Sequence, residues 1–284
     1  MLIFRIIKQV VCAFGLGVAA FVGQAQADAP ARVVSINLCT DQLAMLLAEK
    51  GQLHSVSHIA QDRRVSAMAQ QAGRYSINHG MAEEIYLLQP DLVLAGAFTP
   101  RATVEMLRRL GIPVAEFAPS NTMEDVRARI TRMGEVLHRQ KAARNMVKAF
   151  DARLARLQTD VARRPTAILY YANGYTLGGT TLAGQILRAA GFANAADETG
   201  YAAGRKLPLE VLAMTDPEVV ITAETYPGAS RSEAILDHPV VQAMRDEQAM
   251  MAMTDHDWVC GTPYVLRAVE ALASERDTLT GGAQ

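Results

Sequence analysis

Aromatic and basic side chains gather in the segments that follow the predicted strands of this chain. Aromatic residues make up only 6% of the sequence, so their concentration there exceeds what composition predicts. Aromatic faces stack on flat ligands, and guanidinium groups bind anions through charge-assisted hydrogen bonds. The pattern indicates a site for a flat, anionic ligand, with the single tryptophan as the strongest candidate and core packing as its alternative. We expect the ligand to contact Trp258, Tyr171, Tyr175, His79, Asn78, Phe98, Arg101, Arg63, Arg205 and Tyr226.

Two other kinds of chemistry are weakly supported. The six histidines are scattered, without a histidine-rich loop or an HExxH motif, so direct binding of zinc or manganese ions is the alternative hypothesis rather than the first. No GxSxG, P-loop or GxGxxG motif is present, and the GGTT segment at 178–181 lacks the lysine of a phosphate-binding loop. We therefore expect no catalytic residues, no resident metal and no cofactor.

The elements that must position these residues alternate between strands and helices. The pattern predicts strands at 33–36, 53–59, 90–96, 112–115, 166–171 and 219–221, and helices at 102–110, 182–190 and 264–274. Such alternation is typical of a parallel sheet covered by helices on both faces. The fold class is therefore α/β, with an N-terminal lobe at 28–121 and a C-terminal lobe at 165–284.

Residues 122–164 between the lobes predict two consecutive helices. Thr122 and Asp125 have the spacing of a capping box, and apolar residues then recur at helical intervals on both sides of a charged HRQK segment. Arg163, Arg164 and Pro165 predict the end of the second helix, which would be about 30 Å long. A helix of that length could bridge the two lobes, although an ordinary core helix or a short coiled coil has the same pattern.

The first 27 residues have the pattern of a cleavable secretory signal. Arg5 and Lys8 precede an apolar stretch at 10–22, and the sequence AQA at 25–27 supplies a small-residue cleavage site. We therefore expect a soluble periplasmic protein. The formal net charge of −1 gives no indication of nucleic-acid binding, which leaves a small molecule or another protein as the partner.

A short repeat relates the two lobes. Glu83 is followed seven residues later by Pro90, and Glu210 is followed seven residues later by Pro217. In each lobe the acidic residue is predicted to open a short helix, and a buried strand is predicted directly after the proline.

At this point the chain resembles the periplasmic binding proteins of metal-chelate ABC importers, the family that binds ferric siderophores, haem and cobalamin. The resemblance covers essentially all of the mature chain and is carried by RVVSI at 32–36, HGMAE at 79–83, PDLVLAG at 90–96, the helices after Thr122, and residues 258–272. It implies two Rossmann-like lobes joined by a single long rigid helix, with the ligand in the cleft between them. It also implies a monomer that delivers its chelate to a permease and its ATPase.

The resemblance adds roles for two pairs of residues. Glu83 and Glu210 match the positions at which relatives dock onto arginines of the permease, and acidic residues also favour helix N-termini on their own. Cys39 and Cys260, the cysteines that remain after export, would lie in cleft-facing loops of opposite lobes. They could form a disulfide, remain as buried thiols, or lie near a ligand metal. Among chelates, the arginines favour a ferric siderophore over cobalamin.

Overall fold

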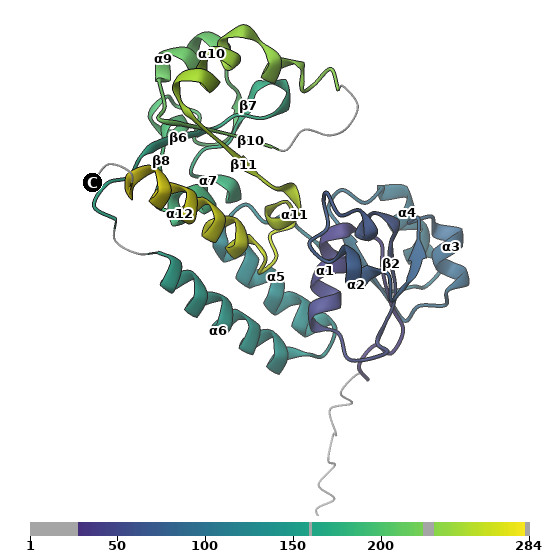
Figure 1. Ribbon diagram of the computed structural model, residues 1–284. Coiled ribbons are helices and arrows are strands. Elements are labelled where there is room, and N and C mark those ends of the chain that lie inside the picture. Colours follow the sequence, from purple (N-terminus) through teal and green to yellow (C-terminus); the bar gives the residue numbers. More distant parts are fainter. Residues whose placement is uncertain (1–27, 159–160, 224–229, 282–284) are drawn as a thin grey trace, which may run out of the picture.

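The computed structural model describes residues 28–158, 161–223 and 230–281 and arranges them as two α/β lobes connected by paired helices (Figure 1). The predicted signal peptide at 1–27 lies outside the described residues. Within the described ranges, no helix combines the length and apolar character needed to cross a membrane. The prediction of an α/β fold with two lobes is confirmed.

The N-terminal lobe is built on a five-stranded parallel sheet in the order β3-β2-β1-β4-β5. Its strands are β1 (Val33–Ser35), β2 (Leu53–Ser57), β3 (Ser76–Asn78), β4 (Leu92–Gly96) and β5 (Val114–Phe117). Its helices are α1 (Leu38–Leu47), α2 (Ala69–Ala72), α3 (Ala82–Leu87) and α4 (Arg101–Arg109). Because successive side chains point to opposite faces of a strand, Val33 packs into one apolar core and Val34 into another. Helices therefore cover both faces of the sheet.

The C-terminal lobe has a four-stranded parallel sheet in the order β11-β10-β6-β8. Its strands are β6 (Thr166–Leu169), β8 (Ala193–Asn194), β10 (Val219–Ala223) and β11 (Ala249–Met253), and a separate two-stranded antiparallel sheet pairs β7 (Tyr175–Thr176) with β9 (Arg205–Lys206). Its helices are α7 (Leu182–Ala189), α8 (Ala195–Glu198), α9 (Leu209–Thr215), α10 (Pro239–Glu247), α11 (Asp255–Trp258) and α12 (Val265–Gly281).

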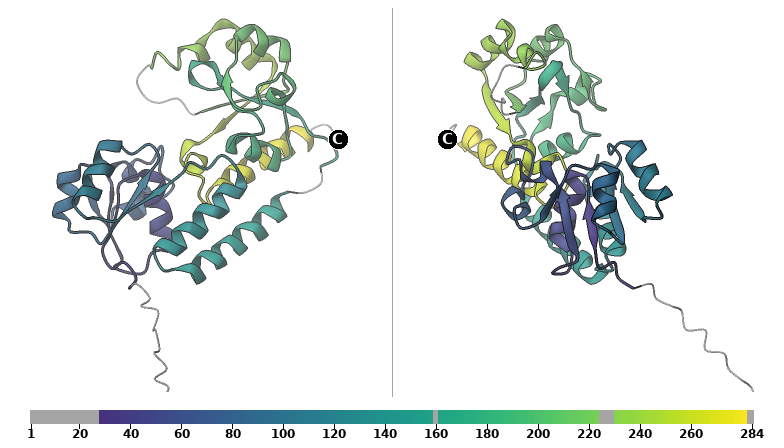
Figure 2. Two further views of the ribbon diagram at one scale, coloured as in Figure 1. Left: turned by 180° about the vertical axis from the view of Figure 1, so that it is seen from behind. Right: turned by 90° about the vertical axis from the view of Figure 1, so that its right-hand side faces the viewer.

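Two helices rather than one connect the lobes. Helix α5 (Met123–Val136) begins with the predicted capping box, in which Asp125 N–H donates to Thr122 Oγ1 over 3.0 Å and Thr122 N–H donates to Asp125 Oδ2 over 2.9 Å. Helix α6 (Gln140–Leu157) returns beside it in the opposite direction (Figure 2). The prediction that the second helix continues to residue 164 was wrong, because α6 ends at Leu157.

Helix α5 is hydrogen-bonded to both lobes. Met123 N–H at the start of α5 donates to Gln185 Oε1 of the C-terminal lobe over 2.8 Å, and Gln52 of the N-terminal lobe donates to the carbonyl of Leu137 at its end over 2.9 Å. The two helices approach closely at Gly134, where a Cβ would lie only 2.3 Å from that of Ala143. One apolar core runs from α1 through α5 and α6 to α7 and α12 and is shared by the lobes, while each lobe has a further core on the other face of its sheet.

A buried carboxyl group lies at the carboxyl edge of the N-terminal sheet. Asp41 of α1 accepts hydrogen bonds from the backbone N–H and the hydroxyl of Ser57, the last residue of β2. Beside it, the hydroxyls of Ser35 and Thr40 are hydrogen-bonded over 2.8 Å. Burial raises the pKa of Asp41 to about 7, although its hydrogen bonds with serines oppose the shift. The carboxyl therefore changes charge inside the fold near neutral pH.

Asp41 should make the stability of the protein depend on pH. Its folded-state pKa lies above that of the unfolded chain, so its contribution to stability is greatest at about pH 4 and is lost as the pH rises through about 7. Relative to Asp41→Asn, the wild type should lose on the order of 1 to 4 kcal/mol of unfolding free energy over this interval, at about 1.4 kcal/mol per pKa unit. Urea denaturation of both proteins at pH 4.5 and 7.5 measures the difference, and parallel pH profiles would contradict it.

Candidate functional site

The carboxyl edges of the two sheets face each other across a disulfide. Cys39 lies in the first turn of α1, directly after β1, where its N–H donates to Asn37 Oδ1 over 3.1 Å. Cys260 follows α11 in the C-terminal lobe and is buried. The structure bonds these two residues, which are 221 positions apart in the sequence, with their Cα atoms 4.8 Å apart. Because ligands of parallel α/β sheets bind beyond the carboxyl ends of the strands, this junction lies at the base of the candidate site.

A buried arginine reinforces the junction. Arg129 of α5 donates from Nη1 to the carbonyl of Cys260 and to Ser120 Oγ, each over 3.3 Å. Burial lowers the pKa of Arg129 to about 10, so the guanidinium is still charged at neutral pH. Gly261 has a φ of +53°, and a Cβ there would lie 2.3 Å from the Cβ of Ser120. Sequence reasoning missed Arg129, although its place between Val126 and Ile130 on the apolar face of a helix was a usable signal.

The C-terminal side of the site is an aromatic pair. Tyr171 follows β6, Trp258 ends α11, and their stacked rings have centroids 5.9 Å apart at an interplanar angle of 27°. Both residues are partly buried against the shared core. Tyr171 Oη and Trp258 Nε1 are buried and have no hydrogen-bond partner in the described part of the chain. Burial, assisted by the negative charge of Asp255, raises the pKa of Tyr171, so its hydroxyl remains a donor.

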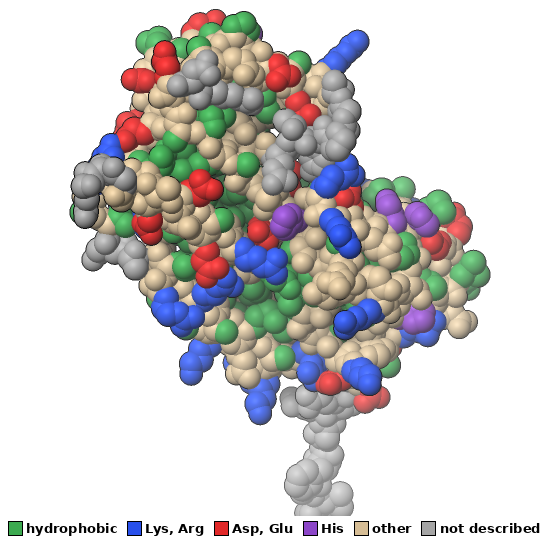
Figure 3. Space-filling view, in the orientation of Figure 1, with side chains coloured by type: hydrophobic (Ala, Val, Ile, Leu, Met, Phe, Trp, Pro, Cys, Tyr) green, Lys and Arg blue, Asp and Glu red, His purple; other side chains and the backbone are tan. Residues whose placement is uncertain are grey.

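The N-terminal lobe contributes a pair of histidines. His58 follows β2 and His79 follows β3, and their stacked imidazole rings lie 5.2 Å apart. Glu84 holds His79, since its carboxylate accepts from the backbone N–H over 2.7 Å and lies 3.3 Å from Nδ1. Figure 3 shows two adjacent histidine side chains on the upper surface of the N-terminal lobe.

Asn78, a predicted ligand contact, makes internal hydrogen bonds in the structure. Its side chain is fully buried, and Nδ2 donates to the carbonyl of Ser35 over 2.9 Å and to Ser55 Oγ over 2.8 Å. Its Oδ1 accepts from Gly80 N–H over 3.2 Å. With donors and acceptor occupied, Asn78 braces the loop that presents His79.

Three predicted contacts on the N-terminal lobe are exposed. Phe98 follows β4 and is 85% exposed. Arg101 begins α4, where its Nε donates to Glu105 over 2.8 Å, and Arg63 lies in the segment after β2. These side chains are exposed to solvent, where a ligand could contact them, and they do not enclose a preformed cavity.

On the C-terminal lobe the predicted contacts gather around the two-stranded β7/β9 sheet. Tyr175 is half exposed, and its carbonyl accepts from Tyr171 N–H over 2.8 Å, which connects this sheet to the aromatic pair. Arg205 stacks over the ring of Tyr201, 4.9 Å from its centroid, and donates to the carbonyl of Gly200. Tyr226, also predicted to contact the ligand, lies outside the described residues.

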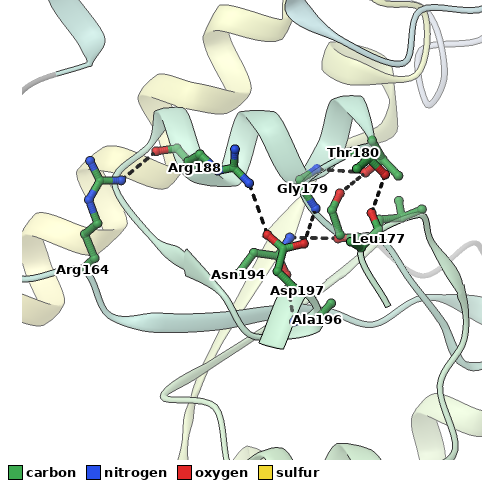
Figure 4. A network of polar contacts seen from close by, with 12 residues as sticks. Arg164, Leu177, Gly179, Thr180, Arg188, Asn194, Ala196 and Asp197 are labelled. Atoms are coloured by element: carbon green, nitrogen blue, oxygen red, sulfur yellow. Dashed lines mark hydrogen bonds and ion pairs between the residues drawn. The ribbon is translucent and has the colours of Figure 1, made fainter. Parts of the chain in front are cut away.

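The GGTT turn at 178–181 is occupied by internal contacts. Gly179 N–H donates to Asp197 Oδ1 over 2.7 Å, and the other carboxylate oxygen of Asp197 is 3.2 Å from Arg188 Nη2 (Figure 4). Because the Asp197 carboxylate already occupies the Gly179 N–H, this group is not free to bind a phosphate. The turn therefore stabilises the C-terminal lobe.

Histidine, cysteine and carboxylate side chains do not converge on a metal site in the described ranges, since no group of three or more could hold an ion. The predicted docking acids Glu83 and Glu210 are exposed in the first turns of α3 and α9. Figure 1 shows these helices at the outer ends of the two lobes, away from the candidate site.

Two α/β lobes share an apolar core and are joined by a disulfide between the carboxyl edges of their sheets. The chain belongs to the periplasmic binding protein family, whose model matches residues 33–246. A cobalamin-binding protein of Halobacterium salinarum is 29% identical over 199 residues, which cover 68% of this chain and 54% of that protein. The chain therefore spans about half the length of this curated relative.

Solved structures show the same fold at low sequence identity. The periplasmic haem-binding protein RhuT from Roseiflexus sp. RS-1 has a TM-score of 0.67 and 19% identity, over 86% of this chain and 96% of that one. The periplasmic vitamin B12-binding protein BtuF of Vibrio cholerae has a TM-score of 0.63 and 19% identity, with the same coverage. The family and these structures are binding proteins.

The disulfide should contribute measurably to stability. Replacing both Cys39 and Cys260 by Ala should lower the unfolding free energy by about 2 to 5 kcal/mol, because the bond restricts the unfolded chain across a long loop. Reduction of the wild type should have the same effect, and reduction of the variant should have none. Mass spectrometry of the non-reduced exported protein should show a linked Cys39–Cys260 peptide; alkylation of both thiols without reductant would exclude the bond.

Proposed function

We propose that this protein captures a metal chelate between its lobes, an iron chelate of the ferric-siderophore type or a cobalamin, and delivers it to the permease of an ABC importer. The observation that carries the proposal is the stacked Tyr171–Trp258 pair beside the junction of the two sheet edges. An aromatic wall of this kind suits a wide, flat ligand, because stacking adds to the free energy of apolar burial.

Exposed arginines on both lobes support an anionic or metal-bearing ligand. Arg63, Arg101 and Arg205 belong to exposed loops or edges of the two lobes, and guanidinium groups bind carboxylates and other anionic oxygens in bidentate fashion. The names of the matched relatives include cobalamin, haem and Fe³⁺-hydroxamate transport, which supports the same chemical class.

Rigidity supports capture without a large closing motion. The shared core and the Cys39–Cys260 bond hold the aromatic pair and the histidine rim at a set separation. A preorganised site loses less conformational entropy on binding than a mobile one. The ligand would therefore enter an already formed recess, and local rearrangement around Tyr171 and Trp258 would supply partners for their buried donors.

Delivery would depend on two exposed carboxylates on the outer surface of the lobes. Glu83 and Glu210 would pair with arginines of the permease, one at each lobe, and two such contacts set the orientation of the loaded protein. The protein would act in the periplasm as a monomer, with the permease, its ATPase and the chelate as its partners.

Trp258→Ala should weaken chelate binding by about 1 to 3 kcal/mol, because it removes the larger ring of the wall. Tyr171→Phe keeps the stacked ring and should change affinity by less than about 1 kcal/mol. Titration calorimetry with a ferric siderophore and with cyanocobalamin would measure both effects, after visible absorption of protein from its native periplasm has identified the chelate class.

Tyr86→Ala is the matched control, since it removes a half-exposed aromatic ring on α3, outside the site. Its affinity should equal that of the wild type. A folded Trp258→Ala variant with unchanged affinity for the identified chelate would contradict the placement of the site.

A further inference from the structure

The two helices that carry Glu83 and Glu210 share further features besides the position of the glutamate. Four residues after each glutamate comes an exposed apolar side chain, Leu87 on α3 and Met214 on α9. Residues four apart lie on the same face of a helix, so each glutamate has an apolar neighbour beside it. We name residues 83–90 and 210–217 the two surface modules.

The backbone of the two surface modules also matches. Gln89 and Asp216, six residues after the glutamates, adopt left-handed conformations with φ of 49° and 43°, although neither is a glycine. Each precedes a buried proline, Pro90 or Pro217. Only four non-glycine residues of the described chain have positive φ, and this conformation is uncommon for such residues. Its occurrence at equivalent positions shows that the repeat is conformational.

Each surface module is held firmly on its sheet. Asp91, the residue after the first proline, accepts from the backbone N–H of Ala31 over 2.7 Å, just before β1. Glu218, the residue after the second proline, accepts from the N–H of Thr166 over 3.0 Å, at the start of β6. The same side-chain-to-strand contact therefore sets the position of each module relative to its lobe.

The apolar side chains of the surface modules are unusually exposed. Leu87 is 79% exposed and Met214 is 84% exposed, a degree that only Phe98 on the cleft rim matches among the large apolar residues of the described chain. Neither Glu83 nor Glu210 forms a hydrogen bond or ion pair within the described ranges, whereas the neighbouring Glu84 is engaged by His79. Beside Leu87 lies a hollow of about 280 Å³, lined by Tyr86, Leu87, Gln89, Pro90 and Ile112.

We propose that Leu87 and Met214 are the apolar anchors of the docking contact, so that each lobe offers its partner one carboxylate and one apolar side chain. The inference rests on the proposed function, because the partner is the membrane permease of the importer. The exposed carboxylates require a cation at each of two points on that partner, and Leu87 and Met214 require an apolar recess beside each cation. Charged rim contacts set orientation and association rate, whereas buried apolar anchors supply most of the binding energy.

The position of the surface modules fits a single partner that contacts both lobes. Figure 1 shows α3 and α9 at the outer ends of the lobes, with the space between the lobes lying between them. The shared core and the disulfide keep the distance between the modules constant. A rigid two-point surface of this kind loses affinity sharply when one point is removed, because the second contact is effectively intramolecular.

The test compares two double variants and one single variant. Each is produced in a strain from which the gene for the wild-type protein has been deleted. Leu87→Ser with Met214→Ser should retain chelate affinity and thermal stability but bind membrane vesicles of the source cell at least about tenfold more weakly, which corresponds to about 1.4 kcal/mol. Chelate uptake should fall accordingly. Leu87→Ile with Met214→Leu should restore both, since these changes keep an apolar side chain. Met106→Ser on α4, 45% exposed and outside both modules, should behave as wild type.

Glu83→Lys with Glu210→Lys separates the inference from the proposed function. If this reversal abolishes vesicle binding while the Leu87→Ser, Met214→Ser protein binds and delivers normally, the carboxylates dock alone and the inference is wrong. If chelate delivery is normal both in the Leu87→Ser, Met214→Ser protein and in the Glu83→Lys, Glu210→Lys protein, the surface modules are not the docking surface. If the wild-type protein neither binds the chelate nor supports uptake, the proposed function itself fails.

Discussion

The junction between Cys39 and Cys260 is the constraint on which the rest of the molecule depends. It holds the first turn of α1 in one lobe against the segment between α11 and α12 of the other. One apolar core extends from α1 of the N-terminal lobe to α7 and α12 of the C-terminal lobe, and α5 is hydrogen-bonded to both lobes. Opening the lobes would therefore expose apolar surface and strain a covalent bond. The two sheet edges face each other as a consequence of this packing.

Buried ionisable groups near the junction add specificity at an energetic cost. Arg129 is removed from solvent, and its Nη1 donates to Ser120 and Cys260, although its Nε has no partner in the described part of the chain. A misplaced C-terminal lobe would remove the Cys260 carbonyl from this guanidinium, so the contact favours the observed arrangement of the lobes. Asp41 acts within the N-terminal lobe, where its hydrogen bonds with Ser57 join α1 to the end of β2.

Much of the fold could be predicted from the sequence because its main strands are continuous apolar runs and its main helices have clear caps. β1, β4, β6 and β10 are of this kind, and Thr122 with Asp125 marked the start of α5. The missed strands had weaker signals. β3 and β8 contain only two or three residues, and β11 is a run of Ala and Met, which favour helices intrinsically. Their pairing is decided by the neighbouring strand, which local patterns do not contain.

The candidate site was less predictable than the fold. Tyr171 and Trp258 could be placed after strands, but their stacking depends on two strands separated by β10 in the sheet. Asn78 is polar and follows a strand, as a ligand contact would. Only the structure shows that its amide donates to Ser35 and Ser55. Sequence spacing identifies which loops share an edge; it does not determine which side chains turn inward.

The most direct test of this account is the thermal melting of the purified exported protein with a panel of ferric siderophores, haem, cobalamin, Zn²⁺ and Mn²⁺. A ligand that binds only the folded state must raise apparent stability, by about 2.7 kcal/mol at a hundredfold excess over its Kd. We expect the melting temperature to rise with one chelate class and to stay unchanged with either bare ion. A shift with zinc or manganese alone would contradict it.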